Sequence, residues 1–197
     1  MVLALIRVVG VQCQTLARGL WESLIHLVAL TAPLSGQCER FRPLRLPNPF
    51  RSVLIVCKAN ICRSPLAEAY LRSQFEQLGR PIAVGSAGLE AAMGRPAHSL
   101  IMGVAREHQL DLSRHVTRVI SGDLVERADL IFVMELSQKV RILRVYPDAS
   151  GKVVLLGSFD PQGPLEIADP YGKSKEEFGS CFAQIRRSCD AFLERLS

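Results

Sequence analysis

Several features that mark other classes of protein are missing from this chain of 197 residues. It has no stripe of lysine and arginine with interleaved aromatic residues, which argues against a nucleic-acid partner. It shows no internal repeat, so nothing in it suggests a repeat architecture. Its most apolar stretch, residues 1–30, is interrupted by Arg7, Arg18 and Glu22, which disfavours a clean membrane span. The order of charged, apolar and cleavage regions that a secretory signal requires is also absent.

A paired cysteine pattern is missing as well. The six cysteines form no recognisable disulfide framework, so we expect a protein of the reducing cytoplasm. The net charge is +5. The first 50 residues hold five Arg and two Glu, a balance of +3, and the remainder holds 19 basic and 17 acidic residues, a balance of +2. The positive charge is therefore concentrated at the N-terminal end.

The length fits one domain plus an extension, and we expect an extension over residues 1–50 followed by a domain over residues 51–197. The segment from Pro43 to Pro49 is typical of an extended linker. Three interpretations of the extension remain open: a helix on a membrane surface formed by residues 1–30, a helix docked on a partner or a second copy, or a start site assigned too early. We favour the last, because the domain needs nothing before about residue 51.

From residue 53 onward, short apolar runs alternate with helical patterns. The apolar runs predict strands near 53–57, 82–86, 129–134 and 153–156. The helical patterns predict helices near 65–78, 97–108, 137–145 and 174–195. Such alternation indicates an α/β fold, in which a four-stranded parallel sheet carries helices on both faces. The functional site of this kind of sheet lies at the carboxyl ends of the strands, where Cys57 ends the first one.

The loop between the first strand and the first helix reads Cys-Lys-Ala-Asn-Ile-Cys-Arg-Ser from Cys57 to Ser64. An oxyanion at a strand-to-helix turn meets several backbone N–H groups and the positive end of the helix dipole. The same field favours a thiolate, which is the nucleophilic form of cysteine. Arg63 can hold two phosphate oxygens with its planar guanidinium. The loop therefore predicts a phosphate-binding site that contains its own nucleophile, Cys57.

Two further residues of the loop support this prediction. Ser64 can donate a hydrogen bond toward the sulfur, and serine is a favoured N-cap residue, here followed by Pro65 in the first helical turn. Asn60 lies in the middle of the loop, where we expect a left-handed backbone that asparagine tolerates better than most residues.

A second motif, Asp169-Pro170-Tyr171, lies far downstream. Together and in this order, the two motifs resemble those of the low-molecular-weight protein tyrosine phosphatases, and the resemblance covers about residues 51–197. Further segments match the family: Ser86-Ala87-Gly88, Gly94-Arg95-Pro96-Ala97, Ala128-Asp129-Leu130-Ile131 and Leu155-Leu156-Gly157-Ser158-Phe159. The Asp-Pro-Tyr-x-Lys-Ser pattern looks like the bacterial branch linked to tyrosine kinases of exopolysaccharide synthesis, which implies such phosphotyrosine proteins as partners.

The resemblance implies hydrolysis of phosphotyrosine through a phosphocysteine on Cys57, with neither metal nor cofactor. It implies that Arg63 clamps the phosphate and that Asp169 is the general acid and then the base. It also implies that Tyr171 is an aromatic wall for the substrate ring and that His115 steadies the loop. The other loop residues are expected to bind the substrate: Lys58, Ala59, Asn60, Ile61, Cys62 and Ser64. Cys62 could also form a reversible disulfide with Cys57 under oxidation.

The chain departs from the family in two places. It has Lys58-Ala59 where the family has Leu-Gly, and residues 89–93 lack the aromatic side chain that forms the other wall of the pocket. Phosphatase chemistry is therefore better supported than a preference for tyrosine phosphate. The alternative is a thiol-dependent arsenate reductase, which shares the fold and the loop. That enzyme needs relay cysteines after the third strand, and residues 131–135 contain none.

Overall fold

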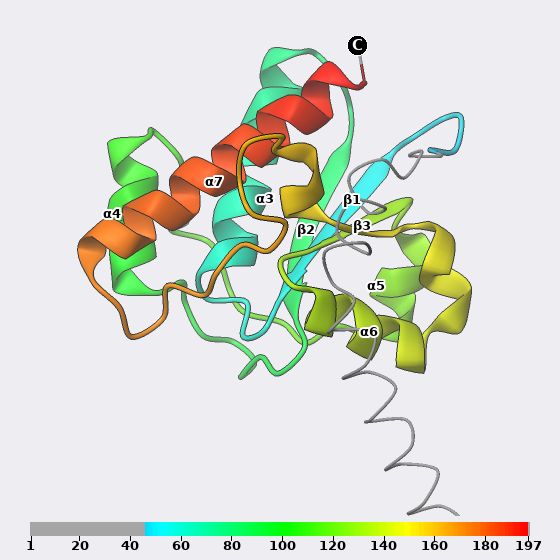
Figure 1. Cartoon of the computed structure of the whole chain (residues 1–197), viewed down its shortest axis with the longest axis horizontal. Helices are drawn as coiled ribbons and strands as arrows, with labels where there is room; N and C mark the ends of the chain where they lie inside the picture. The colour runs from blue at the N-terminus through cyan, green and yellow to red at the C-terminus, as the bar shows by residue number, and fades with distance from the viewer. Residues whose placement is uncertain (1–45, 197) are drawn as a thin grey trace, which may run out of the picture. The chain divides into compact units, whose positions relative to one another are not determined.

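The computed structural model describes residues 46–196, so the expectations for residues 1–45 lie outside it. Within the described range, four parallel strands form a sheet in the order β2-β1-β3-β4 (Figure 1). The strands are β1 Ser52–Cys57, β2 Ala83–Gly88, β3 Leu130–Val133 and β4 Val153–Leu155. The predicted parallel sheet is confirmed, and each strand lies within two residues of its predicted bounds.

Helices join these strands and cover the sheet. The α-helices are α3 Arg63–Gln77, α4 Ser99–Glu107, α5 Gly122–Arg127, α6 Leu136–Val145 and α7 Lys175–Glu194. Two short 3₁₀ helices, Pro147–Gly151 and Leu156–Phe159, flank β4. The chain order is thus an alternation of strands with helical crossovers, as the sequence pattern predicted.

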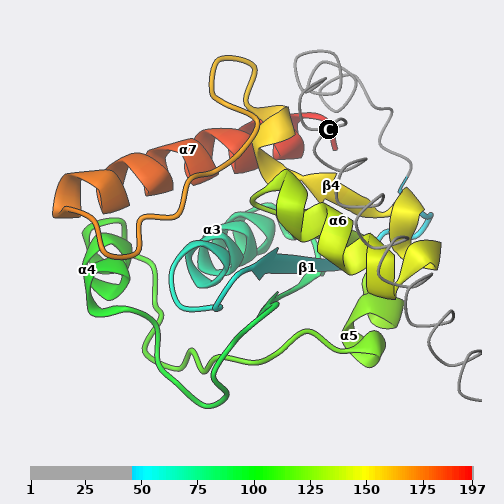
Figure 2. The same ribbon diagram turned by 60° about the horizontal axis from the view of Figure 1, so that its bottom comes forward.

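The alternation of side chains along β1 divides the core between the two faces of the sheet. Val53, Ile55 and Cys57 belong to the cluster that includes side chains of α3 and α7. Leu54 and Val56 belong to the cluster that includes side chains of α5 and α6. In Figures 1 and 2, α3 and α7 lie on one side of β1 and α5 and α6 lie on the other. The prediction of helices on both faces is confirmed, because successive residues of a strand point to opposite faces.

Helix α3 follows the catalytic-loop candidate and fixes its position against the sheet. Its stripe of Ala67, Leu71 and Phe75 is almost fully buried, with exposed fractions of 0, 0 and 1%. Gly79 follows the helix with φ of +64°, a left-handed conformation typical of the residue after a helix end. A third cluster of buried side chains joins α3 to α4 and α7 on the same side.

Two local features differ from the sequence-based prediction. Helix α5 was not predicted, because its six residues are too short to show a helical period. Ser121 caps it by accepting a hydrogen bond from the backbone N–H of Leu124. The assignment of Ser64 as an N-cap was wrong: α3 begins at Arg63, with Cys62 at the cap position. The Ser64 hydroxyl is instead engaged with Cys57 and Asn60.

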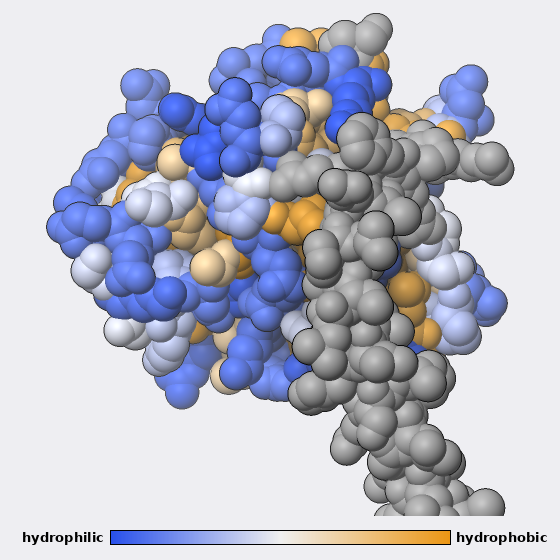
Figure 3. All heavy atoms as spheres, in the orientation of Figure 1, coloured by the Kyte–Doolittle hydropathy of each residue, from blue (hydrophilic) through white to orange (hydrophobic). Residues whose placement is uncertain are grey.

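The surface of the described part is largely hydrophilic on the face shown in Figure 3. No helix within residues 46–196 is long and apolar enough to cross a membrane. Leu46 and Phe50 are partly buried against the α3/α7 cluster, and the Phe50 ring meets the Phe192 ring edge-on at 6.5 Å. Packing of the domain therefore reaches a few residues before position 51.

Candidate active site

The loop that begins at Cys57 lies at the carboxyl end of β1 and runs directly into α3 (Figure 1). Asn60 adopts the predicted left-handed backbone, with φ of 57°. Gly88, at the end of the neighbouring strand, lets the loop approach closely. A Cβ atom at position 88 would lie 2.9 Å from backbone atoms of Lys58, Ala59 and Asn60. This contact gives a physical reason for glycine in the Ser86-Ala87-Gly88 segment.

The Cys57 sulfur is buried and faces hydrogen-bond donors. Its Sγ atom lies 3.0 Å from Ser64 Oγ and accepts a hydrogen bond from the Asn60 backbone N–H at 3.3 Å. The Asn60 side-chain amide donates to Ser64 Oγ at 2.9 Å, which leaves the hydroxyl proton of Ser64 free to point at the sulfur. This arrangement stabilises negative charge on the sulfur, together with the N-terminal end of α3.

Asn60 is fully buried and is held from three other segments of the chain. Its side-chain amide donates to Ser86 Oγ at 2.8 Å, and its Oδ1 accepts from the Arg118 backbone N–H at 3.0 Å. Its backbone carbonyl lies 2.8 Å from His115 Nε2. Ser86 in turn donates to Glu68 on α3 at 2.5 Å. His115 thus lies against the loop, while Ser86, Glu68 and Arg118 are contacts that sequence reasoning did not identify.

Arg63 is almost completely buried, with 1% of its surface exposed, and is surrounded by acceptors. Its Nη1 atom contacts the Glu135 carboxylate and donates to the Ile167 carbonyl at 2.9 Å, and its Nη2 donates to Asp169 Oδ2 at 2.7 Å. Burial lowers the pKa of Arg63, but the hydrogen bond that Arg63 donates to Glu135 and the nearby negative charges raise it more, so the net pKa is raised. The guanidinium is therefore a fixed positive charge beside the loop.

Glu135 is a site residue that sequence reasoning missed. It lies two residues beyond the end of β3, which is the strand next to β1. Its position after a buried strand was a usable signal, because the carboxyl ends of neighbouring parallel strands meet at one edge of the sheet. Nothing local to the sequence says that this carboxylate reaches an arginine 72 positions away.

Asp169 lies in the segment between β4 and α7, and the fold brings it 106 residues back to Arg63. Its side chain is 38% exposed, and its Oδ1 accepts from the Tyr171 backbone N–H at 3.2 Å. Tyr171 is 61% exposed, and its ring meets the His98 ring edge-on at 5.6 Å. His98 also stacks on Phe178 of α7. Nothing local in the sequence links His98 to Tyr171, and only the fold reveals this contact.

The remaining loop residues differ in exposure. Lys58 is exposed, Ala59 and Ile61 are half-buried, and Cys62 is 3% exposed. Burial is the main cause that raises the pKa of the Cys62 thiol to about 12, and the negative charges of Asp169 and Cys57 add to it. Cys62 is therefore a neutral thiol at physiological pH. The described cysteines are all free thiols: Cys57, Cys62, Cys181 and Cys189.

The described site thus combines a nucleophilic sulfur, a fixed guanidinium and a partly exposed carboxylate at the start of a helix. Such an arrangement can bind an oxyanion, attack it and move a proton to or from it. Among residues 46–196, no group of three or more histidine, cysteine or acidic side chains is placed to hold a metal ion.

Comparison with known proteins agrees with this geometry. The family model "Low molecular weight phosphotyrosine protein phosphatase" matches residues 52–197. The low molecular weight protein-tyrosine-phosphatase Wzb of Escherichia coli K12 is 40% identical over 148 residues, which cover 75% of this chain and 97% of that protein.

Solved structures show the same relationship. The structure of the tyrosine phosphatase Wzb from Escherichia coli K30, in complex with sulphate, superposes with a TM-score of 0.70 at 33% identity, over 75% of this chain and 99% of that one. The YwlE arginine phosphatase from Geobacillus stearothermophilus superposes with a TM-score of 0.68 at 29% identity, over 74% of this chain and 92% of that one. The chain therefore belongs to the low molecular weight protein tyrosine phosphatase family.

Proposed function

We propose that this enzyme hydrolyses phosphotyrosine monoesters in proteins through a phosphocysteine on Cys57. The observation that carries the proposal is the environment of the Cys57 sulfur. It lies at the start of a helix, accepts from Asn60, meets the Ser64 hydroxyl at 3.0 Å, and shares its loop with the buried guanidinium of Arg63.

In the first step, the Cys57 thiolate attacks phosphorus, a P–S bond forms and the bond from phosphorus to the tyrosyl oxygen breaks. Arg63 and the loop N–H groups stabilise the charge on the equatorial oxygens of the transferring group. Glu135 and the Ile167 carbonyl hold the guanidinium in place for this task. Asp169 gives its proton to the leaving oxygen, which contributes about 10² to 10⁴-fold to the rate.

In the second step, a water molecule attacks phosphorus and Asp169 accepts its proton. The P–S bond breaks, inorganic phosphate leaves and the thiolate is restored. The hydrogen bond from Ser64 stabilises the sulfur as a leaving group, because its proton is directed there by the Asn60 amide. Asn60 and His115 act on the reaction by positioning the loop, since both are engaged in its backbone and side-chain hydrogen bonds.

The substrate ring would lie against Tyr171, which His98 supports from behind. Lys58 adds an exposed positive charge to the loop and favours acidic sequences around the phosphotyrosine. We propose as partners the autophosphorylated tyrosine kinases of exopolysaccharide synthesis, and the cytoplasm as the compartment that keeps Cys57 reduced. We also propose that residues 51–197 form the phosphatase domain and residues 1–50 an extension to it.

The decisive experiment is hydrolysis of an aryl phosphate against pH, with reductant and chelator and no added metal, for the parent chain, Cys57→Ser and Asp169→Ala. We expect no measurable turnover in Cys57→Ser. In Asp169→Ala we expect kcat to fall by about 10² to 10⁴-fold and to lose its decline at alkaline pH, because the proton donor is gone. Full activity in Cys57→Ser would refute the phosphocysteine.

Two alternatives are separated by substrate. An arsenate reductase would consume thiols when arsenate is added and would not hydrolyse the aryl phosphate, but residues 131–135, in β3 and directly after it, contain no cysteine. An arginine phosphatase would prefer phosphoarginine, as the name of the Geobacillus relative states. Matched peptides that carry phosphotyrosine or phosphoarginine decide this point, and we expect the higher kcat/KM for phosphotyrosine.

A further inference from the structure

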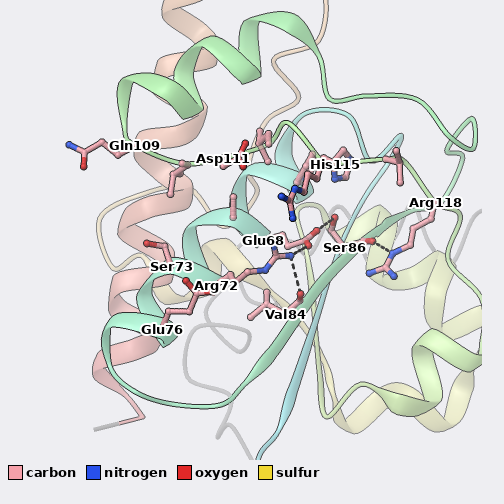
Figure 4. A pocket seen from close by; sticks show the side chains of 16 residues that line it. Glu68, Arg72, Ser73, Glu76, Val84, Ser86, Gln109, Asp111, His115 and Arg118 are labelled. Carbon is pink, nitrogen blue, oxygen red and sulfur yellow. Dashed lines mark hydrogen bonds and ion pairs between the residues drawn. The ribbon is translucent and has the colours of Figure 1, made fainter.

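A cavity of about 730 Å³ lies beside the catalytic loop, between α3, the outer edge of β2 and residues 109–118 (Figure 4). Its walls are polar. Glu68, Arg72 and Glu76 project from α3, Val84 and Ser86 belong to β2, and Asp111, His115 and Arg118 come from the segment that follows α4. The cavity falls within the size range of small-molecule sites. The reaction proposed above makes no use of it.

The outer edge of β2 supplies hydrogen-bond donors to this cavity. Ala83 N–H donates to the Arg51 carbonyl and Leu89 N–H donates to the Cys57 carbonyl. The backbone N–H groups of every second residue from Ala83 to Leu89 therefore face β1. The N–H groups of Val84 and Ser86 therefore point away from β1, and in the described part of the chain no acceptor meets them.

The outward carbonyls of the same edge are already taken. The Val84 carbonyl accepts from Arg72 Nη2 at 3.4 Å, and the Ser86 carbonyl accepts from Arg118 Nε at 2.6 Å. The two arginines thus cover the acceptors of the edge, which disfavours the addition of another strand here. The N–H groups of Val84 and Ser86 remain available to a ligand that is smaller than a strand.

Most of the charged side chains that line the cavity already have a hydrogen-bond or ion-pair partner. Glu68 is engaged by Arg72 and by the Ser86 hydroxyl. Asp111 accepts from Ser113, and these hydrogen bonds lower the pKa of the Asp111 carboxyl, so it stays ionised. Arg114 makes no hydrogen bond or ion pair among residues 46–196, although its charge is near enough to Asp111 to help lower the pKa of that carboxyl. Glu76 is the one lining carboxylate in that range without a hydrogen-bond or ion-pair partner.

We propose that this cavity binds a small molecule that carries carboxylate or phosphate oxygens. The oxygens would accept from the Val84 and Ser86 N–H groups and from Arg114, which are donors that the described protein leaves unused. Glu76 would exclude a second anionic group from its own end of the cavity, so a compact anion fits better than an extended polyanion.

The site is linked to the catalytic loop through shared residues. Ser86, His115 and Arg118 line the cavity, and the same three residues hold Asn60 by hydrogen bonds to its side chain and backbone. A ligand that shifts these residues shifts Asn60, which donates to both Cys57 and Ser64. Occupancy of the cavity and binding of an oxyanion at Cys57 are therefore coupled, and the coupling is reciprocal.

The test uses the full chain and two probes, citrate for carboxylates and inorganic pyrophosphate for phosphates. Backbone amide signals are followed by NMR, with the catalytic loop saturated by orthovanadate so that the probes cannot bind there. At least one probe should shift the Val84 and Ser86 signals in a saturable way. Its dissociation constant should rise at least about tenfold in Arg114→Gln, since a charge-assisted contact is lost. It should stay unchanged in Arg106→Gln, which alters an exposed arginine outside the cavity.

Three results would overturn the proposal. Neither probe shifts the two signals, the dissociation constant is the same in Arg114→Gln and in the parent chain, or binding disappears once orthovanadate is present. The coupling is measured separately, as the ratio of orthovanadate dissociation constants with and without saturating probe. We expect a ratio that differs from one by at least about twofold, and a ratio of one would refute the coupling. None of these signals depends on which phosphoester the enzyme hydrolyses.

Discussion

The two segments that meet at Arg63 are built in opposite ways. The loop around Cys57 is buried, and its central residue Asn60 is hydrogen-bonded to side chains and backbone of three other segments. The segment around Asp169 is open, and Tyr171 is 61% exposed. In the proposed mechanism, the group that attacks phosphorus needs a fixed position, whereas the segment that meets the rest of the substrate must leave room for it. Changes in the buried loop should therefore affect turnover. Changes in the open segment should affect substrate binding, except at Asp169 itself, whose proposed proton transfer belongs to turnover.

Among substitutions outside the proposed reacting groups, the largest effect is expected from Gly88→Ala. The added methyl group would lie 2.9 Å from three backbone atoms of the loop, which must shift. We expect kcat/KM to fall by about 10²-fold, since a misplacement of about 1 Å has that effect, and the free energy of unfolding to fall by about 1–3 kcal/mol. Kinetics and thermal unfolding check both.

The matched control is Gly103→Ala on α4, where a Cβ atom meets nothing within 4 Å. It should leave the kinetics unchanged and raise stability by about 0.5–1 kcal/mol, because alanine is the better helix former. If Gly88→Ala were equally harmless, the loop would not need its close contact with β2.

Next in size is Glu135→Gln. The substitution keeps the shape of the side chain but removes the charge that holds the buried Arg63 guanidinium. We expect kcat/KM for an aryl phosphate to fall by about tenfold, the equivalent of about 1.4 kcal/mol, with most of the change in kcat. Asp123→Asn, which breaks an exposed ion pair with Arg127 on α5, serves as the control and should change nothing. A full-rate Glu135→Gln enzyme would mean that the loop alone positions Arg63.

A smaller effect of a different kind is expected from Tyr171→Ala. Loss of the exposed ring removes a stacking partner for the substrate, worth about 0.5–1.5 kcal/mol, so KM for a phosphotyrosine peptide should rise by about 2- to 10-fold. The value of kcat should change less, and Tyr171→Phe should behave like the parent chain. A fall in kcat with constant KM would show that Tyr171 acts on turnover, as the buried loop does, and not on substrate binding.

The smallest effect on activity is expected from Asp160→Asn, at the start of the segment that leads to Asp169. Burial of Asp160 raises its pKa, but hydrogen bonds from the Gln162 N–H, Arg187 and the Gly163 N–H lower it more, so the net pKa is lowered. A carboxyl with a lowered pKa stabilises the fold above its unfolded-state value of about 3.9, and the contribution is lost as pH falls below that.

Asp160→Asn should therefore lower the unfolding temperature by several degrees at pH 7, and the difference from the parent chain should shrink at pH 3. Its kcat should stay within about twofold of the parent value, because the carboxylate lies away from the reacting atoms and a 1–3 kcal/mol loss does not unfold the domain. An unfolding-temperature difference that is the same at both pH values would show that ionisation of Asp160 does not contribute.

Sequence reasoning reached the sheet, its parallel order and the helices on both faces, because these follow from short-range periodicity. It predicted a helix near 65–78, and the helix found there buries Ala67, Leu71 and Phe75 along one stripe. It did not find α5, which spans less than two full turns. It assigned Ser64 to the helix cap because serine favours that position, but in the fold the Ser64 hydroxyl serves the Cys57 sulfur.

The sequence by itself determined the loop around Cys57, because a strand end, five loop residues and a helix start are contiguous and their geometry is local. Only the tertiary structure decided which distant groups meet that loop. Arg63 contacts Glu135 and Asp169, which lie 72 and 106 residues away. The Asp-Pro-Tyr motif marks Asp169, and a place after a buried strand marks Glu135, but neither local signal says that the carboxylate contacts Arg63. They are selected because parallel strands bring their carboxyl ends to one edge, where a buried guanidinium requires acceptors and negative charge.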